Sequence, residues 1–109
     1  MLRSIKSPQR APRMLAFKVT GTGTAAISVG AKDASLADNG TGDYTLTFEA
    51  AFARVPVAVA TSESAGVYCE VIPSATAVQV LCKAADGTEA AEDAIVHVMV
   101  LGYDAADEY

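Results

Sequence analysis

The chain has 109 residues, a formal net charge of −5 and 51% hydrophobic residues, and it contains no tryptophan. This length suits a single domain with a modest core. No apolar run approaches the roughly 20 residues that a membrane-spanning helix requires. The first residues are charged and lack an apolar segment, so we expect neither a secretory signal nor a membrane partner.

Basic and acidic residues are divided unevenly along the chain. Residues 1–13 hold four basic and no acidic residues, a charge of +4, whereas residues 14–109 hold four basic and 13 acidic residues, a charge of −9. Two prolines in the basic stretch resist regular structure. We therefore predict a basic, extended N-terminal arm at 1–13, a β-domain at 14–104 and an acidic C-terminal tail at 105–109.

Alternating polar and apolar residues, separated by turns rich in glycine, proline and asparagine, predict an all-β fold. The clearest alternation is at 44–48, where every second residue is apolar. Residues 30–36 are expected to form an irregular return, followed by a turn at 38–42 in which Gly40 has a positive φ. About seven or eight short strands predict an antiparallel β-sandwich of jelly-roll or immunoglobulin-like topology. The expected strands are 14–20, 25–29, 44–48, 55–61, 67–72, 77–83 and 94–102.

The last expected strand differs from the others because residues 95–101 are almost continuously apolar. Such a run predicts burial on both faces, either in the middle of a sheet or at a subunit interface. A single histidine in this setting is expected to be a buried or interface residue, since no catalytic or metal-binding partners are visible. The residues assigned to a possible subunit interface are Ile95, His97, Met99 and Leu101.

Cys69 and Cys82 each lie in a strand-like run and could face each other across a hairpin. We expect two buried thiols in the reduced form, since free cysteine packs as a small hydrophobic residue. A disulfide between them is the alternative.

Three short patterns lack the context that their functional interpretation requires. Residues 21–26 fit G-x-G-x-x-A, but β-branched residues follow where a dinucleotide site needs a helix. The Asn-Gly-Thr sequon at 39–41 is interpreted as a turn. Asp33, Asp38 and Asp43 do not have the spacing of an EF-hand calcium loop.

The sequence shows no Ser-His-Asp motif and no nucleophile elbow. We therefore predict that the protein is not an enzyme and has no catalytic residue, cofactor or metal. Nucleic acid is not an expected partner, because the acidic domain would repel phosphate and the arm has no aromatic residue to stack on bases.

Four stretches resemble small β-structured virion proteins of tailed bacteriophages, namely their capsid decoration or cement proteins and tail-fibre tip domains. They are G-T-G-T-A-A-I-S-V-G at 21–30, G-D-Y-T-L-T-F at 42–48, F-A-R-V-P-V-A-V-A-T at 52–61 and D-A-I-V-H-V-M-V-L-G-Y-D at 93–104. The resemblance covers roughly residues 18–104. It implies a β-sandwich, often trimeric, that binds other virion proteins and carries no catalytic residues.

On this resemblance we expect a capsid decoration or cement protein that binds and stabilises the head shell, because the chain is too short for a fibre shaft. Its expected partners are the major capsid protein or other virion proteins and further copies in a homotrimer. It would be made in the host cytoplasm and would reside on the capsid surface of the virion. A tail-fibre, tail-tip or head–tail attachment component is an alternative.

The N-terminal arm is the expected attachment segment, because its basic residues can pair with carboxylates on a partner and become ordered on binding. The arm residues assigned to partner binding are Leu2, Arg3, Ile5, Lys6, Arg10 and Arg13. A carbohydrate-binding β-sandwich is a further alternative. The alternation places four aromatic residues in the core, namely Phe17, Tyr44, Phe48 and Phe52. Few aromatic residues then remain to form a sugar-binding platform, which weakens this alternative.

Overall fold

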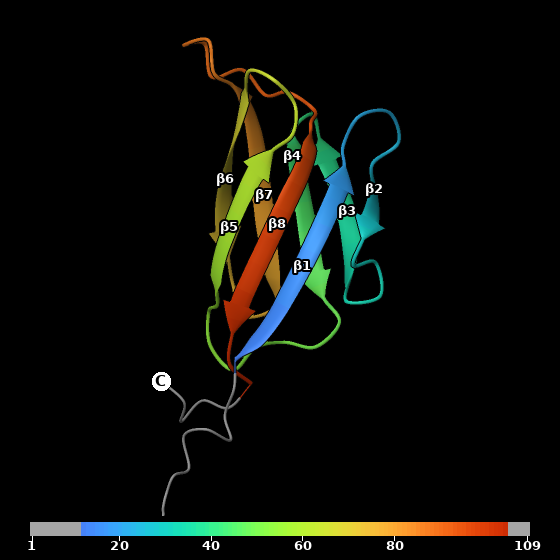
Figure 1. Ribbon diagram of the computed structural model, residues 1–109, viewed down its shortest axis with the longest axis vertical. Helices are drawn as coiled ribbons and strands as arrows, with labels where there is room; N and C mark the ends of the chain where they lie inside the picture. Colours follow the sequence, from blue (N-terminus) through green and yellow to red (C-terminus); the bar gives the residue numbers. More distant parts are fainter. Residues whose placement is uncertain (1–11, 105–109) are drawn as a thin grey trace, which may run out of the picture.

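The computed structural model describes residues 12–104, which form eight strands and no helix. Of the six residues assigned to the arm, only Arg13 is among the described residues. The other five arm residues and the acidic tail lie outside them. Figure 1 shows the strands running along the long axis of the molecule. They are β1 (Arg13–Thr20), β2 (Ala26–Val29), β3 (Ala34–Gly40), β4 (Asp43–Phe48), β5 (Val57–Ser62), β6 (Val67–Pro73), β7 (Ala77–Ala84) and β8 (Ile95–Gly102).

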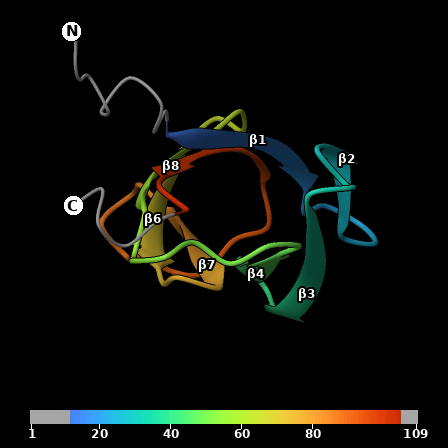
Figure 2. The same ribbon diagram turned by 90° about the horizontal axis from the view of Figure 1, so that it is seen from below.

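The strands form two antiparallel four-stranded sheets. One sheet has the order β2-β1-β8-β5 and the other β3-β4-β7-β6. Seen end-on, the sheets lie opposite each other, with β1 and β8 on one side and β4 and β7 on the other (Figure 2). This arrangement confirms the predicted all-β, sandwich-like fold, but it does not establish a jelly-roll or immunoglobulin-like topology.

The core lies between the two sheets and is filled by every second residue of the central strands. β7 shows this most regularly, because buried residues alternate with partly exposed ones along its whole length. All four aromatic residues that the alternation placed in the core are buried, and Phe48 packs edge-to-face on Phe52 with 5.3 Å between ring centroids. The largest fully buried side chains are Val19, Tyr44, Leu46, Val78, Val80, Cys82, Val96 and Val100.

β3 is the main departure from the sequence-based prediction. Residues expected as an irregular return and turn form a strand that pairs with β4 along its length. The run Ala-Ser-Leu-Ala-Asp-Asn-Gly is small and polar, so it carries little strand signal of its own and its pairing with the strongly alternating β4 decides its structure. The turn is consequently shorter than predicted and lies at 41–42. Gly40 does have a positive φ, of 132°, as predicted.

The β3–β4 turn is fastened to the connection between β7 and β8. The Gly42 N–H donates a hydrogen bond to Asp93 Oδ1 at 2.9 Å, and the Tyr44 hydroxyl donates to the same oxygen at 2.7 Å. These two hydrogen bonds hold the pKa of the Asp93 carboxyl below its usual range. Burial raises the pKa of Tyr44, so its hydroxyl stays protonated and remains a donor. The carboxylate of Asp93 thus joins segments about 50 residues apart in the chain.

Gly42 allows this close approach because it has no side chain. The effect of adding a side chain at Gly42 can be compared with the same substitution at a glycine of similar backbone conformation. Gly42 and Gly66 have φ of +66° and +75°. A Cβ at Gly42 would lie 2.5 Å from the Cys82 carbonyl oxygen, whereas a Cβ at Gly66 would meet nothing within 4 Å. Gly66→Ala should cost about 1 kcal/mol for the left-handed conformation.

Gly42→Ala should cost at least about 1 kcal/mol more than Gly66→Ala, since overpacking adds to the same backbone strain. Urea denaturation of both variants measures the difference. Equal losses would show that the turn can move away from β7 without cost.

Candidate assembly surface

β8 lies between β1 and β5, so it is a central strand, which is the first of the two settings expected for it. Within residues 12–104, however, only one of its faces is buried. Val96, Val98 and Val100 point into the core, whereas His97, Met99 and Leu101 are exposed. The prediction of burial on both faces is therefore wrong for the single chain, and His97 is not a buried residue.

The outward side chains of β1, β8 and β5 form rows across the sheet, because the three strands are paired in register. The first row is Met14, Leu101 and Val57, the second is Ala16, Met99 and Val59, and the third is Lys18, His97 and Thr61. We call the first two the apolar rows and the third the polar row. Together they form the outer face of this sheet.

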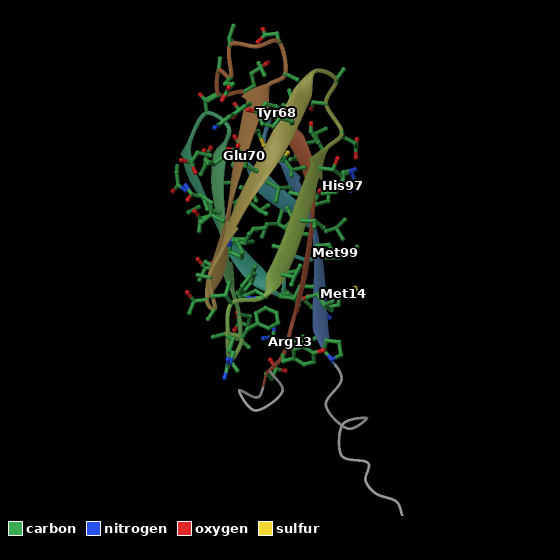
Figure 3. All side chains as sticks on the ribbon, turned by 90° about the vertical axis from the view of Figure 1, so that its left-hand side faces the viewer. Arg13, Met14, Tyr68, Glu70, His97 and Met99 are labelled. Carbon is green, nitrogen blue, oxygen red and sulfur yellow. The ribbon has the colours of Figure 1, made fainter. Side chains whose placement is uncertain are left out.

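The apolar rows expose large side chains that no other part of the described chain covers. Met14, Val57, Val59, Met99 and Leu101 are between 37% and 69% exposed. In Figure 3, Met14, Met99 and His97 follow one another along the same side of the molecule. Isolated apolar residues are common on protein surfaces, but contiguous apolar patches mark interaction sites.

A hollow of about 260 Å³ lies on this face, where the second row meets the polar row. The small side chain of Ala16 leaves space between the longer side chains of Met99 and His97, which also line it. The one aromatic residue of its lining, Phe17, is buried in the core and offers no exposed ring for stacking. The hollow therefore suits an inserted apolar side chain better than a sugar.

A glutamate beside the polar row offsets its positive charge. Glu63 lies in the loop after β5. Its Oε2 atom is 2.6 Å from His97 Nε2 and forms an ion pair of 3.2 Å with Lys18 Nζ. The hydrogen bonds from His97 and Lys18 lower the pKa of Glu63, so it is ionised at neutral pH. The outer face thus carries no large net charge.

The opposite sheet has a different outer face. There Lys83 of β7 pairs with Glu70 of β6 at 3.0 Å, and Gln79 donates to Asp43 Oδ1 at 2.9 Å. A polar face of this kind is the usual solvated side of an antiparallel sheet. The apolar rows are therefore a property of one sheet and not of the whole surface.

Sequence reasoning identified the β8 members of this face but missed Met14, Ala16, Val57 and Val59. A signal for them exists, because residues 14–17 of β1 and 57–60 of β5 are apolar at odd and even positions alike. Such runs predict that both sides of a strand are covered. We used this signal only for β8, where the run is longest.

Arg13, which we assigned to the arm, is the first residue of β1. Its guanidinium donates to Asp104 Oδ1 at 2.9 Å and to the carbonyl oxygens of Ala50 and Ala51 at 2.9 and 3.2 Å. It also lies 4.0 Å from the ring centroid of Phe52. These contacts tie both ends of the described chain to the Phe52 loop, so Arg13 has a structural role in the fold.

Cys69 and Cys82 are direct partners in the β6–β7 pairing, as the hairpin prediction required, and both are free thiols. Cys82 is buried and Cys69 is only partly buried. Within residues 12–104, no three His, Cys, Asp or Glu side chains gather closely enough to hold a metal ion. The same residues include no helix that is long and apolar enough to cross a membrane.

No protein-family model, no curated protein and no solved structure matches the chain. Function is therefore inferred from the residues of the chain and the geometry they adopt.

The structural role of Arg13 gives a prediction. Arg13→Ala should lower the free energy of unfolding by about 1–2 kcal/mol, because it removes the cation–π contact and two hydrogen bonds to backbone carbonyls. Asp104→Asn removes only an exposed ion pair and should change it by no more than about 0.5 kcal/mol. Chemical denaturation of both variants distinguishes these effects. A loss of equal size in Asp104→Asn would mean that the ion pair dominates.

Proposed function

We propose that the protein is a structural virion protein of a tailed bacteriophage, a decoration or cement protein of the capsid, that assembles through the outer face of β1, β8 and β5. The observation that carries the assembly role is the pair of contiguous apolar rows on the outer face of one sheet. The assignment to a phage head rests on the resemblance of residues 18–104 to small virion proteins. No catalytic step is part of the proposal.

Further copies of the same chain are the partner that we assign to the outer face, in a homotrimer. Residues 12–104 carry five basic and 11 acidic residues, so copies of the chain repel one another over most of their surface. The outer face is the exception, because the charge of Lys18 offsets that of Glu63 there. Copies that meet through this face bury apolar side chains without bringing like charges together.

The outer face also bears on the two alternative functions. A tail-tip or head–tail attachment component would use the same face for assembly and differs only in its position on the particle. A carbohydrate-binding module needs exposed aromatic side chains beside its site. The hollow on the outer face has none, so this alternative has less support.

A charge placed in the second apolar row tests the assembly. Met99→Glu should weaken self-association of the full chain by at least about 100-fold, since an unpaired charge would be buried at the interface. Ile72→Glu is the control, because Ile72 is similarly exposed, at 55% against 48%, on the outer face of the other sheet. Sedimentation equilibrium gives the oligomeric state, and thermal melts show whether each variant is folded.

We expect the wild type and Ile72→Glu to be trimers and Met99→Glu to be a folded monomer. A wild type that remains monomeric at high micromolar concentration would exclude the homotrimer. Equal weakening in both variants would place the interface elsewhere.

The virion assignment is tested on particles of the phage that encodes the chain. Cryo-microscopy and mass spectrometry of these particles should locate the chain on the head shell. Particles that lack it should bind the purified protein in multiple copies. Density on the tail alone would favour the attachment alternative, and absence from the particles would exclude a virion role.

The arm has a prediction of its own. Replacing Arg3, Lys6 and Arg10 by serine should leave the melting temperature unchanged but weaken binding to such particles, and binding of the wild type should weaken as salt rises. A second variant, Leu2→Ser with Ile5→Ser, separates apolar anchoring from charge. Co-sedimentation with particles at several salt concentrations measures both. Undiminished binding of both variants would show that the arm is not an anchor.

A further inference from the structure

Two free thiols meet inside the sandwich where β6 pairs with β7. Cys69 and Cys82 are directly opposed in the register of these strands, and their Sγ atoms are 3.7 Å apart. Side chains of opposed residues project to the same face of a sheet. Because Cys82 is only 1% exposed, both thiols point toward the core.

The backbone places this pair at a separation that a disulfide can span. The Cys82 N–H donates to the Gly42 carbonyl oxygen at 2.7 Å, and the Cys82 carbonyl accepts from the Glu92 N–H at 3.0 Å. Both groups of Cys82 thus point away from β6, so Cys69 and Cys82 form a non-hydrogen-bonded pair. Cα atoms in such pairs are about 4.5 Å apart, within the range of about 4.4–6.8 Å seen in disulfides.

We propose that Cys69 and Cys82 are a site of reversible oxidation that reacts with small-molecule disulfides and closes a bond between β6 and β7. The thiolate of one cysteine attacks the small disulfide, which forms a mixed disulfide and releases one small thiol. The second cysteine then attacks the mixed disulfide and releases the other small thiol. The two protein thiols are oxidised and the small disulfide is reduced to two thiols, so electrons and protons balance.

Cys69 is the cysteine that reacts first, because it is the only one of the two that is partly exposed. The hydrogen bond between the two sulfur atoms lowers the pKa of Cys69 and raises that of Cys82. The thiolate therefore forms on the accessible side of the pair. Once Cys69 is in the mixed disulfide, that hydrogen bond no longer disfavours the thiolate of Cys82.

The bond would link the edge strand β6 covalently to its neighbour β7. Among the described residues, β6 is the last strand of its sheet and is paired only with β7. Linking Cys69 to Cys82 closes the hairpin between them and limits the freedom of the unfolded chain. The inference does not depend on the proposed function. If that function holds, the bond would close after release from the reducing cytoplasm of the host.

The test uses the full chain, incubated with oxidised glutathione and then freed of it. We expect both thiols to become unreactive toward Ellman's reagent and the intact mass to fall by two hydrogens. On a non-reducing denaturing gel the protein should run as a single chain, because the bond forms within one chain, and the melting temperature should rise by at least about 5 °C. Dithiothreitol should reverse every change.

Single variants separate this site from unspecific oxidation. Cys82→Ala should stop at the mixed disulfide and retain one bound glutathione on Cys69. Cys69→Ser should remain unmodified while folded, because Cys82 is buried. Thiols that stay reactive in the wild type, or that link only between chains, would overturn the proposal. A bond that closes without raising the melting temperature would exclude the locking of β6.

Discussion

The register of β8 between β1 and β5 is the constraint on which the rest of the structure depends. Side chains alternate along a strand, so this register sends Val96, Val98 and Val100 into the core and leaves His97 and Met99 outside. A shift by one residue would exchange the two sets and expose the valines. The same pairing that builds the core therefore also aligns the outward side chains into rows. The core and the outer apolar rows are two consequences of one register.

The outer face of one sheet carries the apolar rows, whereas the outer face of the other sheet is mainly polar. The charge of the chain gives this difference a consequence for association between copies. The chain is acidic, which keeps copies apart in solution unless a surface lacks net charge. Lys18 and His97 both contact Glu63 at the end of the apolar rows, and the charge of Lys18 offsets the negative charge there. Their side chains remain partly exposed, so we assign these contacts a role in the specificity of association and little role in the stability of the fold.

Strands with strong alternation were predictable, and the departures have physical causes. β4 and β7 carry their own pattern, so their positions follow from local sequence. β3 does not, because its small and polar residues become a strand only by pairing with β4. The outer face was half predictable: the continuous apolar run of β8 was visible, but its alignment with Met14 and Val57 depends on pairing between distant segments. Contacts of that kind, like those of Arg13, leave no local signal.

The two ends of the described chain and the first apolar row share one end of the sandwich. Arg13 joins the start of β1 to Asp104 just after β8, and Met14 and Leu101 stand beside them in the register. Residues 1–11, with their basic charge, are therefore attached to the chain next to the apolar rows. If copies meet through those rows, their N-terminal segments start close together, which raises the local concentration of basic residues facing a partner. Assembly and attachment would then reinforce each other, because each copy added to the cluster brings another arm to the same place.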